Sequence, residues 1–200
     1  TMLVFSPTFR SGSLSTNPIL TGDGRREIIA ADRESGLKTA TVCADHFKGG
    51  GLVSGEPGDD LRLLERLVEA TVEIGAACLL LPFIEHSSVG DAGGRFRLTG
   101  LLRPALDLAA SGGLVLAAET DLAADVLGEW VDEVAHPAFG VYYDLGNAVA
   151  DGFDPVAEIT VLGDRIKGVH VKDRSLGGPN VPLGEGEVDF EGAFAALTET

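Results

Sequence analysis

The sequence is short of basic residues. Lys and Arg together number 15, against 31 Asp and Glu, which gives a formal net charge of −16. Charge of that sign would repel a nucleic-acid backbone or an anionic membrane surface. Long apolar runs are also lacking, because no stretch approaches the ~20 uninterrupted apolar residues that a membrane span needs. We therefore expect neither a nucleic-acid partner nor a membrane partner.

Cysteine is scarce as well, and Cys43 and Cys78 are the two in the chain. Each lies within an apolar run, which favours a buried free thiol over a disulfide or a metal ligand. Free thiols fit a reducing compartment. The first six residues lack the basic and apolar regions of a secretory signal peptide. These absences make the cytoplasm the expected location.

What the chain does contain is typical of a folded α/β protein. Its 200 residues include 44% hydrophobic and 23% charged residues, close to the globular average. Short apolar runs alternate with amphipathic stretches, which is the rhythm of βα units. We expect one domain over residues 1–200, and we expect strands at 2–5, 37–44, 76–84, 113–118, 139–143 and 166–171.

The helices predicted between these strands cover 25–35, 61–72, 99–111, 122–134 and 155–162, with a last one from Phe190. The third strand is apolar on both faces, which favours a parallel sheet covered on both sides. An open doubly wound sheet and a (β/α)8 barrel both satisfy the pattern. The barrel usually needs ~250 residues. The chain therefore looks like a barrel that lacks its first and last strands.

Polar residues follow the apolar runs at the point where each strand should end. In parallel α/β folds the carboxyl ends of the strands form the active site. The residues at these ends are Asp45, His46, Glu85, Glu119, Asp144 and His170. Glu119, Asp144 and His170 are 25 and 26 residues apart, about one βα unit each, so their side chains should converge. Two carboxylates and an imidazole suit Mn²⁺, Mg²⁺, Co²⁺ or Zn²⁺.

Four motifs resemble the xylose isomerase-like TIM-barrel family of sugar phosphate isomerases and epimerases. They are LAAETD at 116–121, VYYDLGN at 141–147, VHVKDR at 169–174 and PLGEGEVDF at 182–190. Their order and spacing match the family, and the similarity extends from about residue 17 to the end. The resemblance implies that Glu119, Asp144 and His170 are three of four ligands to one divalent ion. It places the fourth ligand, a Glu or Gln, beyond Thr200.

The resemblance also implies an enzyme that isomerises or epimerises a ketose or ketose phosphate through an enediolate. The metal would act as a Lewis acid, and Glu119 is the natural base. Lys172 lies two residues after His170 and so points to the same side of an extended chain. It is a candidate cation for the enediolate or a phosphate, or else a salt-bridge partner. The candidates for substrate contacts are His46, Glu85, Asn147 and Arg174.

Other functions share parts of this pattern. A metal-dependent dehydratase of an inositol-like ketone would use the same ligands, and a non-catalytic sugar-binding fragment would keep the fold. An endonuclease of the same superfamily would carry more histidines than the 4 found here and a basic surface. Gly184-Glu185-Gly186 lacks the third glycine of a dinucleotide fingerprint. The sequence leaves assembly into a homo-oligomer open.

Overall fold

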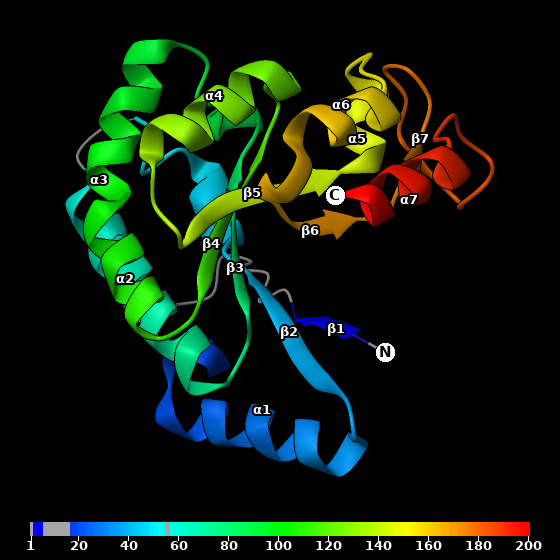
Figure 1. The fold of residues 1–200 in the computed structure, drawn as a ribbon. Coiled ribbons are helices and arrows are strands. Elements are labelled where there is room, and N and C mark those ends of the chain that lie inside the picture. Colours follow the sequence, from blue (N-terminus) through cyan, green and yellow to red (C-terminus); the bar gives the residue numbers. More distant parts are fainter. Residues whose placement is uncertain (1, 6–16, 55–56) are drawn as a thin grey trace.

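The computed structural model describes residues 2–5, 17–54 and 57–200. Its main feature is a sheet in which six strands of the described chain run parallel, in the order β1-β2-β3-β4-β5-β6 (Figure 1). The strands are β1 (Met2–Phe5), β2 (Lys38–Cys43), β3 (Cys78–Phe83), β4 (Val115–Thr120), β5 (Phe139–Asp144) and β6 (Ile166–His170). All the strands predicted from the sequence are present at the expected places.

The order of the strands decides between the two predicted architectures. Each strand pairs with the next one along the chain, whereas a doubly wound sheet reverses its order at a switch point. Consecutive parallel neighbours are the arrangement of a (β/α)8 barrel. The six strands therefore form part of such a barrel, and the α/β fold class is confirmed.

The helices are α1 (Gly22–Ser35), α2 (Gly58–Glu73), α3 (Ala92–Ser111), α4 (Ala124–Val134), α5 (Leu145–Ala150), α6 (Pro155–Leu162) and α7 (Phe190–Glu199). Helix α3 begins earlier than its predicted start at residue 99, because the Asp91 side chain accepts a hydrogen bond from the Gly94 N–H at 2.7 Å and caps the helix. Helix α5 was not predicted. It is a short helix that follows β5 directly.

The two faces of the sheet bury different sets of side chains. Leu79 and Leu81 belong to the large core between the sheet and the helices, which also contains Trp130. Cys78 and Leu80, which alternate with them along β3, belong to a separate small cluster on the other face. The members of that inner cluster are Cys43, Cys78, Leu80, Ala117 and Tyr142. This cluster fills the inner face of the partial barrel next to the carboxyl ends of its strands.

A short antiparallel hairpin follows the last strand of the sheet. It pairs β7 (Asp173–Arg174) with β8 (Asn180–Val181), and its loops extend outward between β6 and α7 (Figure 1).

Both cysteines are free and buried, as predicted. Among the described helices, none combines the length and the apolar content needed to cross a membrane.

Candidate metal centre

The period of the strands places three polar side chains above the inner cluster. Glu119 lies two residues after Ala117 on β4, and Asp144 lies two residues after Tyr142 on β5, so each shares a face with a member of that cluster. His170 ends β6 and is in register with Asp144. Each residue lies at or next to the end of one of three neighbouring strands, and the fold therefore brings the three together.

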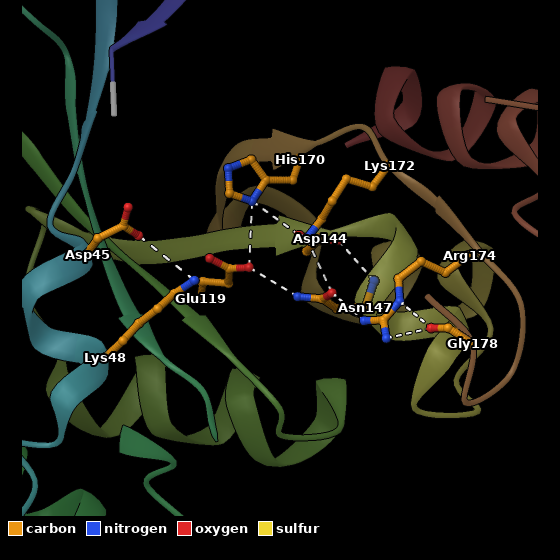
Figure 2. A network of polar contacts seen from close by, with 9 residues as sticks. All are labelled: Asp45, Lys48, Glu119, Asp144, Asn147, His170, Lys172, Arg174 and Gly178. Atoms are coloured by element: carbon orange, nitrogen blue, oxygen red, sulfur yellow. Dashed lines mark hydrogen bonds and ion pairs between the residues drawn. The ribbon is translucent and has the colours of Figure 1, made fainter. Parts of the chain in front are cut away.

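The three side chains form a compact and largely buried group, shown in Figure 2. The Nδ1 atom of His170 is 3.6 Å from Oε1 of Glu119 and 3.2 Å from Oδ2 of Asp144. Both carboxylates are buried, with 4% and 5% of the residue exposed, while His170 is partly exposed. One donor atom from each residue lies within 4.8 Å of the other two.

Contacts within the group shift the pKa values of His170 and Asp144 so that both side chains are charged. Burial opposes protonation of His170, but its contacts with Asp144 and Glu119 outweigh that effect and raise its pKa to about 9. Burial likewise opposes ionisation of Asp144, yet hydrogen bonds from His170 and Lys172 lower its pKa to about 2. The group thus holds a negative carboxylate against positive neighbours.

Lys172 and Asn147 connect the three residues to the adjoining loop. The Lys172 ammonium lies 2.6 Å from Oδ2 of Asp144. Asn147 uses both ends of its carboxamide: its Nδ2 donates to Oε1 of Glu119 at 3.2 Å, and its Oδ1 accepts from Lys172 and Arg174 at 3.2 and 2.9 Å (Figure 2). The Asn147 backbone N–H also donates to Oδ1 of Asp144 at 2.9 Å, because Asp144 caps α5.

The donor set of Glu119, Asp144 and His170 fits a divalent metal. Ligand atoms about 2.1 Å from one ion are about 3.0–3.4 Å apart at octahedral or tetrahedral angles, close to the 3.2 and 3.6 Å measured from His170 to the two carboxylates. Two carboxylate oxygens and one imidazole nitrogen suit Mn²⁺, Mg²⁺, Co²⁺ or Zn²⁺. The two distances from His170 are therefore compatible with one ion held by the group.

A cavity of about 430 Å³ opens beside this group. Its wall includes Glu119 and His170 and most of the residues that the sequence suggested for substrate contacts. The lining residues are Cys43, Asp45, Lys48, Ile84, Glu85, Glu119, Asn147, His170, Lys172, Arg174 and Asn180. His46 is not among them: it contacts Oδ1 of Asp60 on α2 at 2.8 Å. The structure thus gathers Glu85, Asn147, Lys172 and Arg174 at the cavity and places His46 elsewhere.

A family model described as xylose isomerase-like TIM barrel matches residues 5–200. The chain belongs to this family. The match confirms the resemblance that the four sequence motifs indicated, and it agrees with the order of the strands in the sheet.

Two relatives within the family are named for their activity. The chain is 31% identical over 185 residues to the 2-epi-5-epi-valiolone 7-phosphate 2-epimerase of an Actinoplanes species, a match that covers 90% of this chain and 67% of that protein. It is 27% identical over 188 residues to the L-ribulose-5-phosphate 3-epimerase UlaE of Salmonella paratyphi C, covering 88% and 66% of the two chains. The chain thus spans about two thirds of the length of these relatives.

A solved structure in the family has the same fold. The xylose isomerase domain protein from Planctomyces limnophilus superposes with a TM-score of 0.81 at 20% identity, over 98% of this chain and 83% of that one. Sequence reasoning did not find Lys48 and Asn180, which line the cavity from the 3-10 helix Asp45–Gly49 and from β8. Neither residue ends a strand of the sheet, so the rule that located the other residues gave no signal for them.

Proposed function

We propose that the protein is a metal-dependent isomerase or epimerase of a ketose or ketose phosphate, acting through an enediolate. The observation that carries the proposal is the group Glu119, Asp144 and His170 at a cavity of about 430 Å³, a volume in the range of small-molecule sites. The names of the two relatives, both epimerases of phosphorylated compounds, support the same reaction class.

Three cationic side chains, which line the cavity together with the carboxylates of Asp45, Glu85 and Glu119, favour a phosphorylated substrate. Lys48, Lys172 and Arg174 all line the cavity, in a chain that has 15 basic residues and a net charge of −16. Arg and Lys are the side chains that bind phosphate most strongly. We propose that the anionic group of the substrate lies toward these cations, while its carbonyl and neighbouring hydroxyl lie toward Glu119 and His170.

Glu119 is the proposed base. Its carboxylate takes the proton from the carbon next to the substrate carbonyl, and the electron pair of the broken C–H bond moves into the enediolate. A divalent ion held by Glu119, Asp144 and His170 would supply Lewis-acid stabilisation of the enediolate oxygens. Asn147 orients the base through its hydrogen bond to Oε1, and Lys172 adds positive charge beside Asp144.

Inversion of a carbon requires that the proton return from the opposite face of the enediolate. A second acid must supply it there, because Glu119 reaches one face alone. The family resemblance implies that this second acid is a carboxylate at the end of the eighth strand of the barrel. Abstraction by Glu119 and inversion by both acids are therefore separable in experiment.

Metal binding tests the ligand set. Mn²⁺ should bind the wild-type protein in calorimetry and be lost, or weakened at least tenfold, in Asp144→Ala and His170→Ala. His136→Ala is the matched control, because this histidine contacts Asp107 on α3 and does not line the cavity. Unchanged Mn²⁺ affinity in both Asp144→Ala and His170→Ala would disprove the site.

Solvent exchange tests the base. With L-ribulose 5-phosphate in D₂O, the wild-type protein should exchange the proton next to the carbonyl, and Glu119→Gln should slow this exchange by about 10²–10⁴-fold. The substrate affinity should change much less, because the amide keeps the shape of the carboxylate. Exchange at the wild-type rate in Glu119→Gln would exclude Glu119 as the base.

A further inference from the structure

Asp173 holds an unusual position for a charged residue. It is 1% exposed, and its carboxylate accepts backbone hydrogen bonds from a segment more than ten residues later. Gly184 and Gly186 donate to Oδ2 at 2.7 and 2.9 Å, and Val188 donates to Oδ1 at 3.2 Å. Burial opposes its ionisation, but the backbone donors, with Gly186 the strongest, outweigh burial and lower its pKa.

The segment that donates to Asp173 is shaped for this contact. A Cβ on Gly186 would lie 2.2 Å from Oδ1 of Asp173, so a side chain there would displace the carboxylate. Gly184 has a φ of +89°, in the region that favours glycine. The two glycines and the aspartate therefore form one unit, in which the backbone closes around a buried charge.

The same unit closes the loop that carries Arg174. The Glu187 N–H donates to the Arg174 carbonyl at 3.0 Å, and the loop is tied to the end of α5 by a hydrogen bond from Gly177 to Ala150 at 2.8 Å. The Arg174 guanidinium in turn donates twice to the Gly178 carbonyl, at 2.9 and 2.7 Å, and once to Oδ1 of Asn147 at 2.9 Å.

A continuous chain of contacts thus joins Asp173 to the base. The Asp173 carboxylate holds the backbone of the loop. The Gly178 carbonyl of that loop accepts from Arg174, Arg174 donates to Asn147, and Asn147 donates to Glu119, as Figure 2 shows. We propose that Asp173 is a positioning residue. It closes the loop formed by residues 174–188 and so holds Arg174 at the cavity wall, where Arg174 binds the anionic group of the substrate. The effect on substrate binding rests on the proposed function; the effect on the loop does not.

Two variants weaken the contact from opposite sides. Asp173→Asn keeps the shape but replaces one acceptor oxygen with a donor, and Gly186→Ala pushes a methyl group toward the carboxylate. We expect each to speed hydrogen exchange at the Gly184, Gly186 or Val188 amides by at least about tenfold, with strand β5 unchanged. Asp154→Ala is the matched control, because Asp154 accepts backbone hydrogen bonds at the start of α6, away from the cavity.

The position of Arg174 has its own readout. Its Nε–H donates to Gly178, so its side-chain NMR signal should be slowly exchanging in the wild type and in Asp154→Ala. That signal should shift and exchange faster in Asp173→Asn and Gly186→Ala. Loop amides and an Arg174 signal that stay as in the wild type in both variants would overturn the proposal, whether or not the protein is an epimerase.

The kinetics of solvent exchange with L-ribulose 5-phosphate in D₂O then test the link to substrate. Asp173→Asn should raise KM at least about tenfold with a smaller change in kcat, and so should Arg174→Ala, because both lose the same charged contact. The double variant should be no worse than Arg174→Ala alone. Fully additive losses would overturn the role of Asp173 through Arg174. Absence of any solvent exchange in the wild type would contradict the proposed function, and the NMR and amide-exchange results would still decide the positioning role.

Discussion

Glu158 offers a quantitative test of how the partial barrel is held together behind the site. This residue of α6 is 9% exposed. One carboxylate oxygen accepts the Ala124 N–H at the start of α4 at 2.8 Å, and the other accepts the Tyr143 hydroxyl at 2.9 Å. Because Tyr143 precedes Asp144 on β5, Glu158 links two helices to the strand that carries a candidate ligand.

The structure sets the expected size of the effect. Glu158→Ala leaves the Ala124 N–H and the Tyr143 hydroxyl without their acceptor, at about 1–3 kcal/mol each. An adjoining cavity of about 20 Å³ has room for one water that would satisfy part of this loss. We therefore expect Glu158→Ala to lower the free energy of unfolding by about 2–4 kcal/mol. Glu158→Gln should lie within about 1 kcal/mol of the wild type, because its carbonyl can accept from Ala124 while its NH₂ donates to the Tyr143 oxygen.

The dependence on pH has a defined sign. Burial raises the pKa of Glu158, and the hydrogen bonds from Ala124 and Tyr143 offset only part of this shift. A carboxyl whose pKa is higher in the folded than in the unfolded state stabilises the fold fully below about pH 4, and that contribution is lost as pH rises through the folded pKa. Glu158→Gln does not titrate. The free energy of unfolding of Glu158→Gln should therefore rise relative to that of the wild type as the pH rises from about 4 to about 7.

Urea unfolding of the wild type, Glu158→Gln and Glu158→Ala at several pH values measures both effects. Glu129→Gln is the control, because Glu129 is an exposed residue of the neighbouring helix α4. The reasoning is refuted if Glu158→Ala unfolds within about 0.5 kcal/mol of the wild type, or if Glu158→Gln loses stability relative to the wild type as the pH rises.

Three further predictions concern the sheet. Burial raises the pKa of Cys78 to about 12 and also raises that of Cys43. A thiol-specific chromogenic reagent at pH 8 should therefore label the folded protein at least about a hundredfold more slowly than the urea-unfolded chain. Equal labelling rates would contradict this prediction. In Gly168→Ala the new Cβ would lie 2.3 Å from the Tyr142 ring, so overpacking should lower the melting temperature by an amount equivalent to about 1–3 kcal/mol, and an unchanged value would show that the ring moves freely. Strands β1 and β6 each pair with one neighbour among the described residues, and such edge strands pair readily with other chains. The 200-residue chain should therefore self-associate in sedimentation velocity. A monomer at about 100 μM would show that both edges are protected.

The sequence alone determined the elements of the sheet and the position of the polar residues at its edge. Apolar runs and helical periodicity are local properties, and they identified every strand of the sheet. The regular spacing of Glu119, Asp144 and His170 then followed from the length of a βα unit, because neighbouring strands must end at the same edge. Their role as metal ligands remains a prediction that the metal titration tests.

The tertiary structure decided the features that depend on contacts between distant residues. Helix α5 forms because Asp144 caps it, and the hairpin of β7 and β8 forms because Asp173 gathers amides that lie 11 to 15 residues away. Neither feature has an apolar period that a sequence can reveal. The same holds for His46, which follows a strand as Glu85 does but contacts α2 instead of the cavity. A loop side chain is placed by the partner that it meets, and only the folded chain specifies that partner.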